Sequence, residues 1–196
     1  MKEIYIVLTQ TGTILSNIIK LITKKQYNHA SISFDKNLNS LYSFGRINPY
    51  IMFIGSFVRE GVNIGTFKRF KNTKCKIYKL QVTDEQYDLM IEEMVKMLEH
   101  KKEYKFNTIG LFFVWLKIKK QYPNRFYCSE FVKYILQKGK VDISKMPDIV
   151  YPEHLTLIDN IELIYEGLLR EYEVLNEEVN IWETIVAGLQ RKVINI

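Results

Sequence analysis

The run from Cys75 to Val82 alternates apolar and polar side chains, which is the pattern of a β-strand with one buried face. Thr83-Asp84-Glu85-Gln86 follows directly, and a threonine three residues before a glutamine is typical of a helix N-terminus. We expect this helix to run to about Lys101. The apolar face of a strand has to be covered by another layer. A strand followed directly by a helix therefore favours helices packed on a sheet.

The chain opens with the same alternation of strand and helix. Residues 3–9 read as a strand, Thr11-Gly12-Thr13 as a turn, and apolar residues at helical spacing predict a helix over 14–22. His29-Ala30-Ser31-Ile32-Ser33-Phe34 and Ser40 to Phe44 flank a polar cluster, which predicts a β-hairpin that starts at His29. These elements predict an α+β fold with an antiparallel sheet.

The remaining elements are expected as follows. Residues 45–65 form a long irregular connection, with short strands around Val62 to Phe67. A second helix starts at Asn107 or Thr108 and ends near Lys119, and a third covers 126–136. Residues 161–165 and 168–172 form a closing hairpin around Gly167. The segment from 173 is an amphipathic helix that packs on the domain or, in a homodimer, on a second copy.

Composition narrows the class of protein. A chain of 196 residues with 47% hydrophobic and 26% charged residues fits one globular domain. The apolar start is too short for a signal peptide, and no run approaches the roughly 18 apolar residues of a membrane span, so we expect a cytoplasmic protein. The net charge of +6 permits an anionic partner, including peripheral contact with a membrane. Nucleic-acid motifs are lacking, and no nucleic acid is expected.

Cys75 and Cys128 lie far apart without CxxC or CxxH spacing, so we expect neither a disulfide framework nor a metal site, and no cofactor. Cys75 belongs to a strand and reads as a small apolar residue. Cys128 falls in the first turn of the helix over 126–136, after the break Pro123-Asn124-Arg125. Unpaired backbone N–H groups at a helix start stabilise a thiolate and can receive an oxyanion.

A thiolate nucleophile needs a base, and the chain has three histidines. His100 ends a charged helix, which is typical of a surface residue. His154 follows Pro152-Glu153 and stays an alternative. His29 begins a strand, and a strand histidine facing a helix cysteine is the arrangement of cysteine hydrolases, so His29 is the preferred partner.

The order of these pieces resembles a known family. A strand, a turn and a helix precede Tyr27-Asn28-His29-Ala30-Ser31-Ile32, and Phe126-Tyr127-Cys128-Ser129-Glu130-Phe131-Val132 comes later. This layout resembles the circularly permuted, NlpC-like branch of the papain fold, which includes YiiX-like enzymes and is similar to lecithin retinol acyltransferase. The resemblance covers residues 1–172, leaves 173–196 as an extension, and implies an antiparallel sheet packed against a helix that begins at the nucleophile.

The resemblance also implies two further site residues. A third polar residue on the strand after the histidine strand orients the imidazole, and this falls at Ser43 or its neighbours, where the usual histidine, amide or acid is missing. Asp35 and Glu60 are alternatives, although each reads as a loop charge. Tyr127 is expected to frame the oxyanion site or to face the core. Glu130 is expected to stabilise the helix start.

The sequence therefore predicts a cysteine-dependent amidase, peptidase or acyltransferase acting on a peptide or lipid amide or ester through an acyl-enzyme. His29 would deprotonate Cys128. The alternative from another class is a non-catalytic module that binds lipid or peptide in the same place, which the serine at 43 favours. A basic protein that binds anionic lipid surfaces is a third option.

Overall fold

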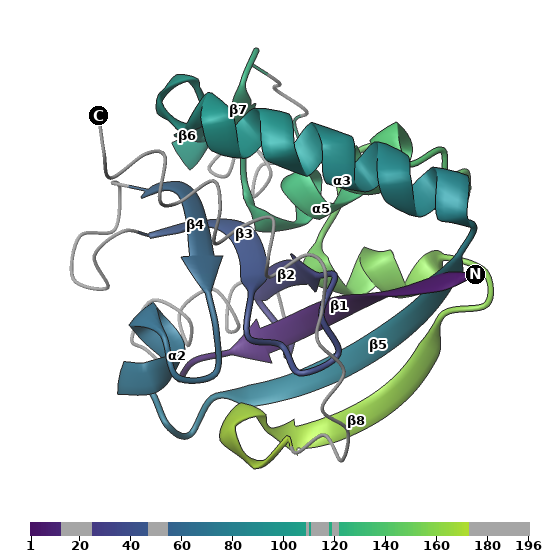
Figure 1. Cartoon of the computed structure of the whole chain (residues 1–196). Coiled ribbons are helices and arrows are strands. Elements are labelled where there is room, and N and C mark those ends of the chain that lie inside the picture. The colour runs from purple at the N-terminus through teal and green to yellow at the C-terminus, as the bar shows by residue number, and fades with distance from the viewer. Residues whose placement is uncertain (13–24, 47–54, 109, 111–117, 119–121, 173–196) are drawn as a thin grey trace.

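The structure is a computed structural model that describes residues 1–12, 25–46, 55–108, 110, 118 and 122–172. The described residues form one eight-stranded sheet in the order β7-β6-β4-β3-β2-β1-β5-β8 (Figure 1). All neighbouring strands are antiparallel except β6 and β7. The strands are β1 (Lys2–Gln10), β2 (His29–Ser33), β3 (Leu41–Arg46), β4 (Gly55–Glu60), β5 (Lys74–Val82), β6 (Lys105–Phe106), β7 (Arg125–Phe126) and β8 (Glu162–Leu168).

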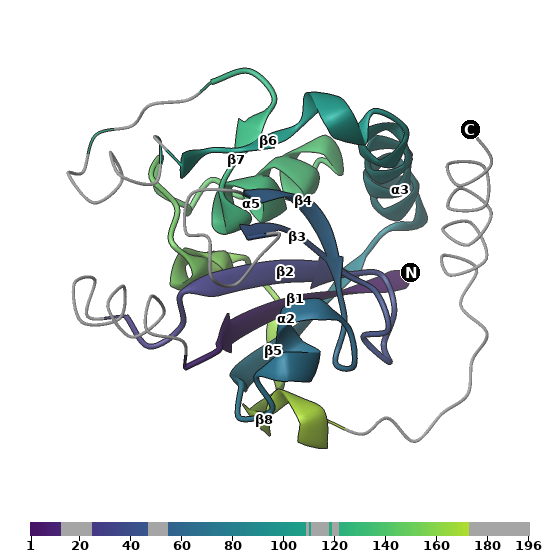
Figure 2. The same ribbon diagram turned by 90° about the vertical axis from the view of Figure 1, so that its left-hand side faces the viewer.

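Helices lie on both faces of the sheet (Figure 2). The larger core joins one face to α3 (Asp84–Glu99) and α5 (Cys128–Lys138). On the other face, α2 (Gly65–Arg69) and the 3₁₀ helix η3 (Leu169–Glu171) contribute to a smaller core. Two further 3₁₀ turns, η1 (Lys101–Glu103) and η2 (Pro152–Leu157), complete the described helical elements. The α+β class is therefore confirmed.

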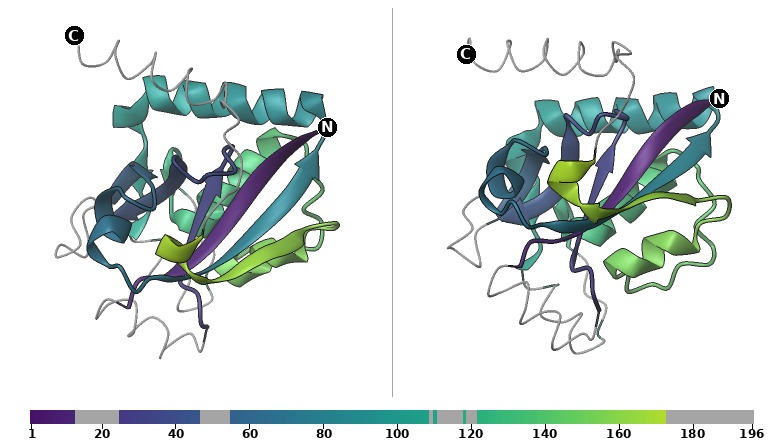
Figure 3. Two further views of the ribbon diagram at one scale, coloured as in Figure 1. Left: turned by 60° about the horizontal axis from the view of Figure 1, so that its bottom comes forward. Right: turned by 90° about the horizontal axis from the view of Figure 1, so that it is seen from below.

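Side-chain alternation explains the two cores. In β1, Ile4, Ile6 and Leu8 belong to the larger core, whereas Tyr5 and Val7 face the smaller one. Strand β1 runs between β2 and β5, and both of its faces are buried because a core lies on each side of the sheet. The views from below in Figure 3 show β1 and β5 side by side along much of their length.

The helix expected after Val82 is confirmed as α3. Its N-cap, Thr83, accepts a hydrogen bond from the Gln86 amide at 3.1 Å, and the Gln86 side chain accepts one from the Thr83 amide at 3.0 Å. This reciprocal pair satisfies two amides that the helix start would leave unbonded. The strands expected over 3–9 and 75–82 are also confirmed, as β1 and β5.

Three expectations about elements are wrong. The irregular connection expected over 45–65 contains strand β4, which pairs with β3. The short strands expected around 62–67 are replaced by a turn and α2, which begins at Gly65 with a φ of +59° that suits glycine. The closing hairpin expected over 161–172 is a single strand, β8, followed by η3. Strand β8 pairs with β5 instead of folding back on itself, because β5 offers a free edge.

Several expectations fall outside the described residues. They are the helix over 14–22, most of the helix over 107–119, and the C-terminal helix from 173 with its proposed homodimer contact. Within the described part of the chain, no helix is both long enough and apolar enough to cross a membrane.

Candidate active site

Cys128 is the first residue of α5, as the sequence predicts. The first hydrogen bond of the helix runs from the Phe131 amide to the Tyr127 carbonyl at 3.0 Å, so the Cys128 amide precedes the bonded ladder. The Glu130 carboxylate accepts a hydrogen bond from the Tyr127 amide at 3.4 Å. Glu130 therefore stabilises the start of the helix on which the cysteine sits, as expected. The Cys128 side chain is half-buried.

His29 is the first residue of β2 and pairs with Thr9 of β1. Ala30 and Ile32 face the larger core, so His29 and Ser31 project from the opposite face of the strand. The His29 side chain is 18% exposed, which leaves it close to solvent at the end of its strand.

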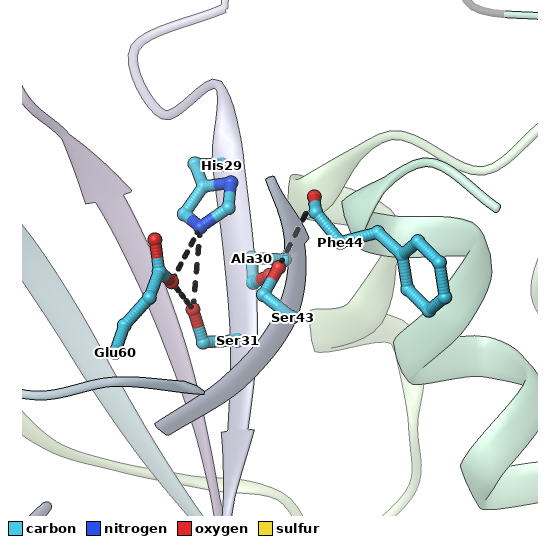
Figure 4. A network of polar contacts seen from close by, with 6 residues as sticks. All are labelled: His29, Ala30, Ser31, Ser43, Phe44 and Glu60. Carbon is cyan, nitrogen blue, oxygen red and sulfur yellow. Dashed lines mark hydrogen bonds and ion pairs between the residues drawn. The ribbon is translucent and has the colours of Figure 1, made fainter. Parts of the chain in front are cut away.

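A carboxylate holds the His29 ring. Glu60 Oε2 lies 2.9 Å from His29 Nε2 and accepts a hydrogen bond from the Ser31 hydroxyl at 3.1 Å (Figure 4). The Ser31 hydroxyl also lies 3.4 Å from the same ring nitrogen. Glu60 is the last residue of β4 and is buried, whereas the sequence pattern placed it in a loop. The structure therefore brings together His29, Ser31 and Glu60 on one face of the sheet.

The Glu60 side chain reaches His29 across β3, which lies between β4 and β2. Ile32 pairs with Tyr42, and continuing this register places Gly45 opposite His29 and Ser43 opposite Ser31. A Cβ at position 45 would lie 3.5 Å from His29 Cε1 and 3.7 Å from Glu60 Oε1. These are ordinary van der Waals distances, so position 45 would accept a methyl group, whereas a larger side chain would compete for space with the ring and the carboxylate.

Ser43 has a different set of contacts from the one expected. Its hydroxyl donates a hydrogen bond to the Ala30 carbonyl at 2.7 Å and lies 3.4 Å from the Phe44 carbonyl (Figure 4). The acceptors are backbone oxygens, one on the neighbouring strand β2 and one on the next residue of β3, and neither contact is to the His29 ring. The carboxylate that contacts the imidazole is that of Glu60.

The Cys128 side chain also lies close enough to the His29 ring to interact with it electrostatically. Burial of the ring lowers its pKa, but the charge of Glu60, the interaction with Cys128 and the hydrogen bond with Glu60 outweigh burial and raise the pKa of His29 to about 10. Because Glu60 engages Nε2, Nδ1 is the ring nitrogen that remains for the sulfur. The fold therefore brings Cys128 and His29 together.

Phe67 of α2 covers the other side of the histidine. Its ring lies edge-on to the His29 ring, with 6.3 Å between centroids and an angle of 61° between planes. Phe67 is buried in the smaller core. The short helix that the sequence pattern did not predict therefore contributes an aromatic wall to the site.

Both neighbours of Cys128 bind the backbone of Val150. The Ser129 hydroxyl donates a hydrogen bond to the Val150 carbonyl at 2.8 Å, and the Tyr127 hydroxyl is hydrogen-bonded to the Val150 backbone. Tyr127 is 6% exposed and belongs to the larger core. Burial raises the pKa of Tyr127, and the charges of Glu130 and Cys128 raise it further. The structure thus places Tyr127 beside the cysteine but faces it into the core.

The other titratable candidates have separate roles. His100 lies at the exposed end of α3, with Nδ1 3.4 Å from Glu103. His154 Nδ1 accepts a hydrogen bond from the Tyr151 amide at 3.2 Å, and burial together with Lys25 lowers the pKa of His154. Asp35 accepts hydrogen bonds from two amides of its own turn, Asn37 and Asn39, at 2.8 and 2.7 Å. None of these contacts involves Cys128.

Cys75 is a buried free cysteine of β5. Burial raises the pKa of Cys75 to about 12, so it stays a neutral thiol near pH 7. This agrees with its interpretation as a small apolar residue. Among the described residues, no group of three or more histidine, cysteine and acidic side chains is placed to hold a metal ion.

The signals for Glu60 and Ser31 in the sequence were indirect. His29, Ser31 and Ser33 alternate with apolar residues, which marks a polar strip on one face of β2. Glu60 was one of two acidic alternatives, and only the strand order identifies it as the partner. Comparison with known proteins adds no identity, since no family model matches the chain and no curated protein is similar to it.

Proposed function

We propose that the protein is a cysteine hydrolase in which Cys128 attacks an acyl carbonyl, His29 transfers protons and Glu60 orients His29. The observation that carries this proposal is the chain of contacts from the Glu60 carboxylate through the His29 ring to the Cys128 thiol at the start of α5. Nucleophile, base and orienting group, in contact in that order, are the parts that nucleophilic catalysis requires.

In this proposal Glu60, and not Ser43, is the third member of the site. The raised pKa of His29 favours an imidazolium at neutral pH, with one N–H directed at Glu60 and the other available to Cys128. A proton moved from Cys128 to His29 would leave a thiolate beside an imidazolium. Glu60 compensates the charge of that imidazolium, which a serine could not do.

The reaction follows from these roles. The Cys128 thiolate forms a C–S bond with the acyl carbon, and the amide of Cys128 at the helix start supports the oxyanion. The C–N or C–O bond breaks as the imidazolium gives its proton to the leaving group. Water then attacks the thioester carbon while His29 takes a proton from it. The C–S bond breaks, His29 returns the proton to the Cys128 sulfur, and the carboxylic acid is released.

Amide hydrolysis is the first choice of reaction, with a peptide or lipid amide or ester as substrate. The antiparallel sheet packed against the Cys128 helix supports a permuted papain-like arrangement of the NlpC type for residues 1–172. The order of residues agrees with permutation, because His29 and Glu60 precede Cys128 in the chain. A cytoplasmic location stays a prediction.

The test is covalent labelling with an acylating probe directed at thiols. Cys128→Ala should abolish labelling, whereas Cys75→Ala should leave it unchanged because Cys75 is buried and neutral. His29→Ala should slow labelling of Cys128 by about 100-fold or more, as expected for loss of a general base. Labelling that persists in Cys128→Ala, or that is unaffected in His29→Ala, would contradict the proposal.

A further inference from the structure

Four exposed basic side chains follow one another at the end of α2 and in the turn into β5. They are Lys68, Arg69, Lys71 and Lys74, which we call the α2 basic cluster. The sequence contains no acidic residue from position 61 to position 74. The cluster is therefore a local excess of positive charge, not part of an alternating charged surface.

The lysines of this cluster differ from those further along β5. Lys76 lies 3.4 Å from Glu166 and Lys79 lies 2.9 Å from Glu162, so both are neutralised by β8. Within the described part of the chain, Lys68, Lys71 and Lys74 form no ion pair. Their charges are available to an external anionic partner.

An exposed aliphatic side chain precedes α2, four residues before Lys68. Ile64 is 40% exposed at the turn that leads into α2, and its amide donates a hydrogen bond to the Gly61 carbonyl at 2.9 Å. A tight turn that presents an exposed isoleucine in the same short stretch of chain as the lysines combines apolar and electrostatic attraction. A lipid headgroup region offers partners for both.

The same short helix also borders the candidate active site. Phe67 of α2 contacts the His29 ring from the buried side, while Lys68 and Arg69 are exposed on the helix. Figure 1 shows α2 at the end of the molecule away from α3 and α5. A surface docked on the α2 basic cluster would therefore lie near the end of β2 that carries His29.

We propose that the α2 basic cluster and Ile64 dock the protein onto an anionic lipid bilayer. Lysine and arginine are attracted to anionic headgroups, and Ile64 enters the interface. A single-stranded nucleic acid fits less well, because it requires exposed aromatic rings for stacking. In this part of the chain Phe67 is buried and Phe70 is half-buried.

The experiment measures sedimentation of the full chain with lipid vesicles. Vesicles with about a third of phosphatidylserine should bind the protein, and vesicles of phosphatidylcholine alone should not. The triple variant Lys68→Gln/Lys71→Gln/Lys74→Gln should bind about 100-fold more weakly, given the usual contribution of each cation near an anionic surface. Ile64→Ser should weaken binding to the same vesicles by several-fold.

A matched triple variant controls for net charge. Lys101→Gln/Lys102→Gln/Lys105→Gln removes three exposed lysines from η1 and β6 and should bind as the unmodified chain does. Equal losses in both triple variants, no binding to phosphatidylserine vesicles, or tighter binding to a single-stranded oligonucleotide would overturn the proposal. The assay is independent of catalysis, so its failure leaves the proposed hydrolase unaffected.

Discussion

Glu60 is the residue that distinguishes His29 from an ordinary histidine at a strand end. Its carboxylate is 10% exposed and lies 2.9 Å from Nε2, and the Ser31 hydroxyl donates to the same oxygen at 3.1 Å. A buried carboxylate in this position fixes the ring and favours its protonated form. The reactivity of Cys128 should therefore depend on a residue two strands away from His29.

Glu60→Gln is expected to slow acylation of Cys128 by about 10- to 100-fold. The amide keeps the size of the side chain and its hydrogen-bonding capacity but removes the charge that compensates the imidazolium. The rate of labelling by a thiol-directed acylating probe near neutral pH measures this effect.

Glu93→Gln is the matched control for that substitution. Glu93 is also buried, and it accepts a hydrogen bond from Tyr134 at 2.6 Å between α3 and α5. It has no contact with His29 among its described interactions. If both glutamine variants slowed labelling equally, the special role of Glu60 would be lost.

Ser43→Ala tests which residue orients the His29 ring: Ser43, as the resemblance implies, or Glu60, which contacts the ring in the structure. Since the Ser43 hydroxyl donates to the Ala30 carbonyl, its loss should cost about 1 kcal/mol in the free energy of unfolding. Labelling of Cys128 should change by less than about 2-fold, because Glu60 remains in place. Urea unfolding and labelling rates check the two effects, and a large loss of labelling would restore Ser43 as the orienting residue.

Cys128 and His29 could be predicted because their signals are local. A helix start after a proline break and a histidine before an alternating run are both visible within about ten residues. Glu60 depends on the order of β4, β3 and β2 and on the small residue at Gly45. No local pattern contains the pairing of three strands, so the sequence left Glu60 as an alternative.

At the scale of elements, hydrogen bonds join the start of α5 to the segment at Val150. Ser129 and Tyr127, on either side of Cys128, both bind the Val150 backbone. The tie fixes where the helix begins and hence where the thiol lies. It also gives Tyr127 a structural role that competes with its expected place beside an oxyanion.

Tyr127→Phe tests which role holds. Loss of the hydrogen bond to Val150 should lower the free energy of unfolding by about 1 kcal/mol, with labelling of Cys128 changed only a few-fold. Removal of a donor to the oxyanion would instead slow acylation by about 100- to 1,000-fold. Urea unfolding and acylation rates on the same preparation distinguish these outcomes, and the larger kinetic loss would assign Tyr127 to the oxyanion site.

The elements themselves were predictable where capping and alternation are strong, as for β1, β5 and α3. They were not predictable where apolar and polar residues alternate in a segment that does not form a strand. Val62 and Ile64 alternate with polar residues as in a strand, but the chain turns at Gly61 and enters a helix after Gly65. Phe67 is buried in the smaller core, and this tertiary contact favours the helix over the strand propensity of its neighbours.

At the scale of the whole molecule, the site joins three distant parts of the chain. His29 and Glu60 lie on the face of the sheet that carries the smaller core, whereas α5 packs on the opposite face. Cys128 meets His29 where β2 begins. Because the three residues meet only in the folded chain, their protonation is coupled to stability.

The direction of that coupling follows from the raised pKa of His29. An unfolded histidine releases its proton near pH 6.5, whereas the folded ring keeps its proton up to about pH 10. The stabilisation by Glu60 is fully present below about pH 6.5 and is lost as the pH rises through the folded value. Transfer of a proton from Cys128 to His29 in the folded state would mask this pH dependence of stability, since the total number of protons that the pair binds would not change.

Cys128→Ser isolates the contribution of the ring. In this variant the free energy of unfolding should fall by about 1 kcal/mol per pH unit between about pH 7 and 8.5, because the folded state binds an additional proton there. Cys75, whose pKa burial raises to about 12, keeps its thiol proton in the folded chain but begins to lose it in the unfolded chain within this range. It adds the same slope with glutamate or glutamine at position 60, so the comparison of the two variants isolates the ring. Adding Glu60→Gln should flatten the slope, since the ring would lose its counter-charge. Urea unfolding at a series of pH values measures both slopes, and parallel slopes would show that Glu60 does not hold the proton on His29.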